Sequence, residues 1–311
     1  MKRSLLSQRS PRLAFALLLA CACLSSAPAA AQKRLSLGVF LPTVPGVSRA
    51  DRFAAAGRLA TFLGKRVGVT VTGRSFAASN LIKRGTVQIA IVPAQLAAER
   101  GWTAFAALRR GGGARATWAI YAKGATRLTE LANKTVAVTR VGGKDSRFVT
   151  NVMLEREVGA GYFKWARFVD WDATIKAVSF GRAQAVVVRS NASVSGLTRV
   201  FTSRALPNPV AVFVSPLPKA TRDKVAAALQ SYPGGWLGFS GFTKIGAATI
   251  RTLRGQLLAG RRGKRVVAAR PDGFALPTRA IVAADASAPK PPSALALVEP
   301  PKLKPDVAAE R

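Results

Sequence analysis

The chain has 311 residues and a formal net charge of +34 at pH 7, from 48 lysines and arginines against 14 aspartates and glutamates. It contains no histidine, and its two cysteines, Cys21 and Cys23, lie close to the N-terminus. A Ser-His-Asp triad, a Cys-His dyad and a histidine-ligated metal site are therefore excluded, and the few carboxylates argue against paired-carboxylate chemistry, so we expect no enzyme, cofactor or metal.

The N-terminal segment has the three parts of a secretory signal peptide. Four basic residues precede an apolar run at 13–24, and Ala29-Ala30-Ala31 follows as a cleavage site. We predict a signal peptide at 1–31 and a periplasmic or secreted protein. The run is shorter than the roughly 20 residues that span a bilayer, which argues against a membrane anchor. A lipoprotein with lipidated Cys21 is the weaker alternative.

Cleavage after Ala31 removes both cysteines, so the mature chain has no disulfide and depends on an ordinary apolar core. The basic residues are spread along the whole chain, and aromatic residues, at 7%, are not interleaved with them as in single-strand binders. We interpret the charge as a solvated surface and do not expect nucleic acid as a partner. Peripheral contact with anionic envelope surfaces is an open alternative.

From Leu35 onward, short apolar runs alternate with amphipathic stretches, a pattern typical of α/β proteins. In the first set of elements we expect strands at 35–41, 69–72, 87–92, 105–108 and 117–122. Helices are expected at 49–65, at 77–84 and after Pro93.

A second set begins with a helical turn at 128–132. Further strands are predicted at 135–139, 167–169, 185–188 and 210–214, and further helices at 146–158, 173–180, 219–230 and 245–258. After Arg261 the pattern degrades. We predict that 261–311, a basic segment followed by a proline-rich one, is largely disordered.

Four segments in order carry a family resemblance. They are LSLGVFLP at 35–42 with the helix ending in L-x-x-F-L-G, LIKRGTVQIAIVPAQL at 81–96, LTELANKTVAVTRVGGKDSRF at 128–148, and VDWDATIKAVSFGRAQAVVV at 169–188. Together they resemble the substrate-binding proteins of phosphate, phosphite and phosphonate ABC transporters, in the type 2 periplasmic binding protein superfamily.

The resemblance implies two α/β lobes with a ligand cleft between them, a first lobe at 35–119 and 208–260, and a second lobe at 120–207. The crossings between the lobes are expected near 120–123 and 207–212. It further implies that the lobes close on a hinge over a small ligand, an anion by analogy, for an ABC permease or a sensor kinase. The alternative is an envelope scaffold or interaction protein that has lost small-anion binding.

The loop at 139–146 is the candidate anion site, because it joins a strand to a helix and offers two glycines, hydroxyls and a lysine. A plain turn with Asp145 or Ser146 as helix cap fits it equally well. The candidate ligand-binding residues are Thr43, Gln95, Tyr121, Thr139, Gly143, Lys144, Ser146, Trp171, Arg189 and Ser190.

Several of these positions depart from the family pattern. The segment 141–146 stands where the family has a hydroxyl-rich cradle, and its Asp145 would repel an anion unless Lys144 or Arg147 offsets the charge. Trp171 stands where the family has a polar contact, so it either stacks on a ligand or fills a core. Arg189, after a buried strand, is either a fixed cation in the cleft or one surface arginine among many.

Overall fold

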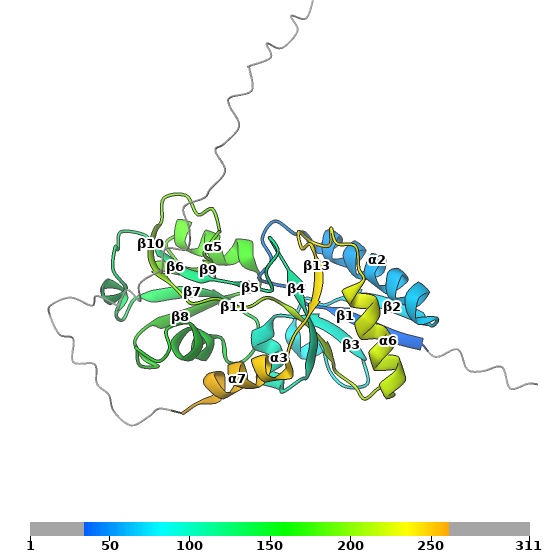
Figure 1. Ribbon diagram of the computed structural model, residues 1–311. Coiled ribbons are helices and arrows are strands. Elements are labelled where there is room, and N and C mark those ends of the chain that lie inside the picture. Colours follow the sequence, from blue (N-terminus) through cyan, green and yellow to red (C-terminus); the bar gives the residue numbers. More distant parts are fainter. Residues whose placement is uncertain (1–33, 261–311) are drawn as a thin grey trace, which may run out of the picture. The chain divides into compact units, whose positions relative to one another are not determined.

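A six-stranded sheet forms the basis of the first lobe (Figure 1). The computed structural model describes residues 34–260, so the predicted signal peptide and the predicted disordered tail lie outside the described residues. The strand order is β13-β4-β12-β3-β1-β2, with β1 parallel to β2 and β3, and β12, β4 and β13 antiparallel to their neighbours. The bounds are β1 Arg34–Val39, β2 Thr70–Ser75, β3 Ile89–Val92, β4 Ala104–Arg109, β12 Val210–Phe213 and β13 Gly241–Lys244.

Three helices pack against this sheet: α2 (Arg49–Val67), α3 (Ala94–Arg100) and α6 (Lys219–Gln230). The first of them begins at a capping box, in which Ser48 and Asp51 each satisfy a backbone N–H of the other, and it ends at Gly68 in the left-handed conformation. It lies so close to β2 that a Cβ added at Gly73 would come within 2.2 Å of the carbonyl oxygen of Ala56. Only glycine permits this approach.

A five-stranded sheet forms the basis of the second lobe, in the order β10-β6-β9-β7-β8. Strands β8, β7 and β9 are parallel, whereas β6 and β10 are antiparallel to their neighbours. Helix α5 packs against this sheet. The bounds are β6 Trp118–Ala122, β7 Thr135–Thr139, β8 Lys164–Phe168, β9 Ala185–Arg189, β10 Thr198–Thr202, α5 Trp171–Ser179, α4 Asp145–Arg147, and the single turns η1 Ser79–Leu81 and η2 Leu128–Leu131.

Two segments cross between the sheets and pair with each other as β5 (Arg115–Ala116) and β11 (Leu206–Pro207). Asn208, fully buried, donates from its side-chain amide to the carbonyl oxygens of Leu108 and Gly113 at 3.0 and 3.1 Å. We expected the first crossing near 120–123, but these residues lie within and directly after β6, because the apolar run continues the second sheet.

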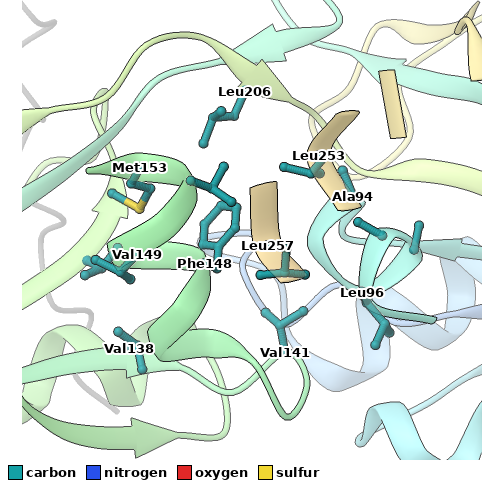
Figure 2. Packing of buried hydrophobic residues seen from close by; sticks show 14 of the residues in the cluster. Ala94, Leu96, Val138, Val141, Phe148, Val149, Met153, Leu206, Leu253 and Leu257 are labelled. Carbon is teal, nitrogen blue, oxygen red and sulfur yellow. The ribbon is translucent and has the colours of Figure 1, made fainter. Parts of the chain in front are cut away.

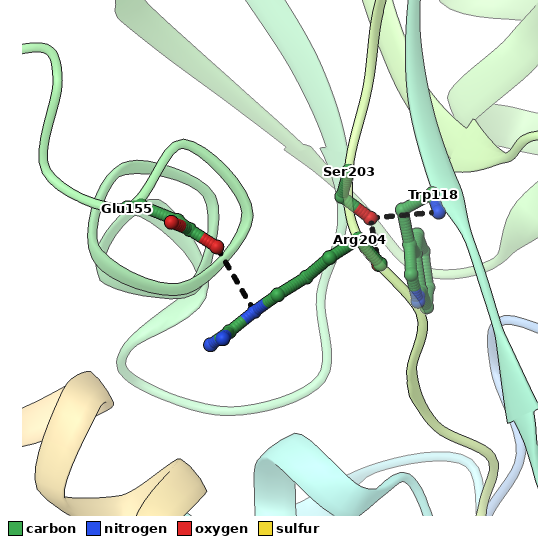
Figure 3. A network of polar contacts seen from close by, with 4 residues as sticks. All are labelled: Trp118, Glu155, Ser203 and Arg204. Carbon is green, nitrogen blue, oxygen red and sulfur yellow. Dashed lines mark hydrogen bonds and ion pairs between the residues drawn. The ribbon is translucent and has the colours of Figure 1, made fainter. Parts of the chain in front are cut away.

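The second crossing begins at Ser203, which is held against β6 (Figure 3). Its hydroxyl accepts the Trp118 N–H at 3.0 Å and donates to the carbonyl oxygen of Arg204 at 2.7 Å. The Arg204–Glu155 ion pair, at 3.0 Å, is half exposed, so we expect it to contribute little to stability. The buried hydrogen bonds of Ser203 and Asn208 are therefore the principal polar ties of this crossing.

One apolar cluster extends from the first lobe into the second (Figure 2). Leu96 of α3 and Phe148 and Val149 of the turn η3 (Phe148–Met153) belong to it, together with Leu253 and Leu257 of the last helix, α7 (Ala247–Leu258). This helix packs against both α3 and η3. The lobes thus share part of their core.

The predicted α/β class is confirmed, and the exact bounds of the lobes stay a prediction. The helix expected at 146–158 is wrong in extent: it consists of the short α4 and the wider turn η3, and it stops where Glu155 and Arg156 take positive φ angles. The helix expected at 77–84 is only the turn η1, and β10 and β13 were not predicted. No helix within 34–260 has the length and apolarity needed to cross a membrane.

Candidate ligand-binding site

Two adjoining cavities lie between the lobes. They share five lining residues, which come from the loop after β1, the start of α3, the start of β6 and the segment around α4: Thr43, Gln95, Trp118, Val141 and Phe148. Each cavity has a volume of about 20 Å³, which is room for about one water molecule. The lining is mostly apolar, so its few polar groups decide what can bind.

Arg189 lines the first cavity from the end of β9. It is 3% exposed and donates from Nη1 to Oδ1 of Asn208 at 3.1 Å, while its Nε has no partner. Its guanidinium and that of Arg110 both lie against the ring of Phe239, at 5.9 and 5.8 Å from the centroid. Burial, together with the charge of Arg110, lowers the pKa of Arg189 to about 10.

No carboxylate neutralises this cation within residues 34–260, where the two ion pairs are Arg204–Glu155 and Lys219–Asp223. A buried charge without a counter-ion is costly, because the interior cannot replace the hydration that the charge has lost. Arg189 is thus a buried cation beside a cavity.

Asp145 lines the second cavity and is 2% exposed. Its Oδ1 accepts three hydrogen bonds, from Nε2 of Gln95 at 2.7 Å and from the backbone N–H groups of Val141 and Gly142 at 3.1 and 3.0 Å. Its Oδ2 has no partner. Burial raises the pKa of Asp145, and the three hydrogen bonds oppose this shift.

A second carboxylate bonds the same loop. Glu99 of α3 accepts the N–H of Gly143 at 3.0 Å, and a Cβ at Gly142 would come within 2.2 Å of its Oε2. The N–H groups of residues 141, 142 and 143 therefore all donate to side chains of the chain itself. The loop at 139–146, which the sequence predicted as an anion site, therefore binds two carboxylates of the chain itself: Asp145 and, from the other lobe, Glu99.

Four of the candidate residues line the cavities: Thr43, Gln95, Thr139 and Arg189. The hydroxyl of Thr139 lies 2.9 Å from that of Thr174, whose proton goes to the carbonyl oxygen of Asp170 at 2.6 Å. Thr139 therefore donates to Thr174 and keeps its lone pairs for another donor.

The other six candidates do not line the cavities. The Tyr121 hydroxyl donates to the carbonyl oxygen of Ser190 at 2.7 Å, which ties β6 to the end of β9. Gly143 is bound to Glu99, Lys144 immediately precedes α4, and Ser146 is half-buried within α4. Trp171 is 4% exposed in the separate core beneath α5, and its backbone N–H donates to the carbonyl oxygen of Pro42 at 2.9 Å.

Sequence reasoning missed the apolar lining, chiefly Trp118, Phe148 and Leu206, because nothing local distinguishes a cavity wall from a core residue. It also missed Asn208, although an asparagine between two prolines in an apolar stretch was a signal that could have been followed. Within 34–260, no group of three or more aspartate and glutamate side chains is placed to hold a metal ion.

Comparisons with known proteins agree with this architecture. PhnD1 from Prochlorococcus marinus in complex with methylphosphonate is 12% identical over 72% of this chain and 97% of its own, with a TM-score of 0.57. A Xanthomonas citri protein bound to ATP is 12% identical over 72% of this chain and 96% of its own, with a TM-score of 0.58. A binding protein component of an ABC phosphonate transporter from Pseudomonas aeruginosa is 12% identical over 69% of this chain and 82% of its own, with a TM-score of 0.54.

At such low identity these likenesses establish the fold alone, and they confirm the type 2 periplasmic binding protein-like architecture. No curated protein matches the chain. The profile of one family, described as ABC transporter, phosphonate, periplasmic substrate-binding protein, matches residues 43–250, which is more than half of the chain. The chain therefore belongs to this family of periplasmic substrate-binding proteins.

Proposed function

We propose that this protein is exported by a cleavable signal peptide, captures a small solute with an anionic group between its lobes, and presents it to an ABC permease. It carries out no reaction of its own. A sensor kinase is the alternative recipient. The observation that carries the proposal is Arg189, a buried cation that lines the cavity between the lobes and has no carboxylate partner among the described residues.

Electrostatics support an anionic group at this position. A ligand carboxylate or phosphonate at Arg189 would supply the missing counter-charge, and the Nε–H of Arg189 would gain an acceptor. Two of the structurally similar proteins described above were solved with anionic ligands, which are methylphosphonate and ATP. The cavities have room for about one water each, so the ligand enters only when the lobes part and then close over it.

A second function has specific observations in its favour. The amides of the loop at 141–143 are occupied by Asp145 and Glu99, and an apolar cluster joins the lobes. Both features favour a closed arrangement that needs no solute. They fit an envelope scaffold or interaction protein that has kept the fold and no longer carries a ligand.

Thermal unfolding in the presence of candidate solutes separates these functions. A panel of phosphate, phosphonates, sulfate, carboxylates and small amino acids is tested for a rise in melting temperature. A solute at 100 times its Kd adds about 2.7 kcal/mol to the unfolding free energy. Arg189→Lys should weaken any such rise, because an ammonium lacks the planar fork of the guanidinium.

The matched control is Arg199→Gln, which removes an exposed arginine from β10 and should leave the response unchanged. If no member of the panel raises the melting temperature of the unaltered protein, solute capture is refuted and the scaffold function is favoured. If Arg189→Lys and the control respond alike, Arg189 is not where the anionic group binds.

A further inference from the structure

The cavities between the lobes are flanked by two buried side chains of opposite charge. Arg189 lines the first cavity and leaves its Nε without a partner, and Asp145 lines the second and leaves its Oδ2 without one. Both side chains are more than nine-tenths buried. In native proteins nearly every buried polar atom has a partner, so two such atoms beside adjoining cavities indicate a ligand that provides both partners.

The charge balance of the site disfavours a plain dianion. A phosphonate dianion beside Arg189 would also lie near the buried carboxylate of Asp145, and the negative charges of the two groups would repel each other. Backbone amides could stabilise such an excess, but those of residues 141, 142 and 143 already donate to Asp145 and Glu99. Among the residues that line the two cavities, Arg189 is thus the one cation that a phosphonate would meet, and this loop offers it no free amide.

A ligand that carries one ammonium and one carboxylate matches the same groups without excess charge. Its carboxylate pairs with the guanidinium of Arg189, whose geometry suits two parallel hydrogen bonds to a planar anion. Its ammonium donates to Oδ2 of Asp145 and to the free lone pairs of the Thr139 hydroxyl, which lines the same cavity. The wall shared by both cavities, Trp118, Val141 and Phe148, covers the apolar skeleton between these ends.

We infer that the ligand of this protein is a small amino carboxylate, with its carboxylate held by Arg189 and its ammonium by Asp145. The inference rests on the proposed function and names the class of solute that this site takes. Asp145 thus acts as the specificity-determining residue: it occupies the loop amides with one oxygen and keeps the other for the ammonium.

Matched pairs of solutes test the inference, because the members of each pair differ only in the amino group. Glycine is compared with acetate, β-alanine with propionate, and 4-aminobutyrate with butyrate, by calorimetric titration of the purified protein. Ethylphosphonate and 2-aminoethylphosphonate form a further pair. At least one amino carboxylate should bind at least about tenfold more tightly than its partner without nitrogen, because the latter leaves buried carboxylate oxygen unpaired.

Asp145→Asn should abolish this preference, since an amide in place of the carboxylate no longer attracts the ammonium. Asp223→Asn, an exposed carboxylate on α6, is the matched control and should keep it. The comparison of pairs on the unaltered protein remains decisive even if Asp145→Asn fails to fold. Plain acids that bind as tightly as amino acids, or binding of phosphonates alone, would overturn the inference and leave solute capture standing. If no solute of either class binds, the proposed function itself fails.

Discussion

Asn208 is the residue whose replacement should reveal how firmly the lobes are joined. Asn208 stands between Pro207 and Pro209 in the sequence. Its side chain is fully buried and makes three hydrogen bonds: two from its amide to the carbonyl oxygens of Leu108 and Gly113, and one from Arg189 to its oxygen. Asn208→Ala removes all three.

The expected loss follows from the kind of partner in each bond. A neutral buried hydrogen bond contributes about 1 kcal/mol and one to a charged group about 2 kcal/mol, so the unfolding free energy should fall by about 4 kcal/mol. For a domain of this size, that loss lowers the melting temperature by about 8 to 16 °C. Circular dichroism during heating and urea titration measures both quantities.

Two further variants make the reasoning refutable. Asn191→Ala replaces an exposed asparagine of the second lobe and should change the unfolding free energy by less than about 0.5 kcal/mol. Asn208→Asp removes both amide donors but gives Arg189 a carboxylate partner, so a loss of stability in this variant would show that the amide bonds outweigh the added ion pair. A loss below about 1 kcal/mol in Asn208→Ala would show that these amide bonds do not hold the crossing.

Three other outcomes are expected. Burial raises the pKa of Asp145 above its unfolded value of 3.8, so the native state keeps this proton to a higher pH than the unfolded state does. The unfolding free energy should therefore fall, relative to that of Asp145→Asn, as pH rises through 3.8 toward the native pKa. Urea titrations at several pH values measure this difference, and a relative rise would contradict the direction of the pKa shift. Gly73→Ala should destabilise the protein by about 1 to 3 kcal/mol, because the new Cβ on β2 meets the backbone oxygen of Ala56 on α2. Gly57→Ala, also on α2 but facing open space, should stabilise it by about 0.5 to 1 kcal/mol in the same assay. Leu253→Ala should cost about 2 to 5 kcal/mol by leaving a void where α7 meets both lobes, and thermal scans with a smaller loss would indicate that the helix only covers a surface.

Local sequence signals predicted the strands and helices that have strong patterns of their own. The apolar runs of β3, β7 and β9 and the capped, amphipathic α2 are examples. Strands β10 and β13 escaped prediction because their side chains are half exposed or their run is short, so that pairing with β6 and β4 rather than local pattern defines them.

The candidate site was predictable to the extent that it depends on residue type at strand ends. Arg189, Thr139 and Gln95 reach the cavities because each follows or ends a buried strand, which a linear pattern reveals. The role of Asp145 was not predictable, because its bonds to the loop are local but its third hydrogen bond comes from Gln95 in the other lobe, 50 residues away. Contacts of this kind exist only once both lobes have folded together.

The apolar cluster that contains Leu96, Phe148 and Leu253 has a consequence for the modularity of the molecule. Lobes that meet only through a wet cleft can be exchanged between relatives or produced separately, since each keeps its own apolar interior. Here either half, produced alone, would leave part of this shared interior facing water. Chimeras of this protein should therefore be joined so that α3, η3 and α7 always come from the same parent.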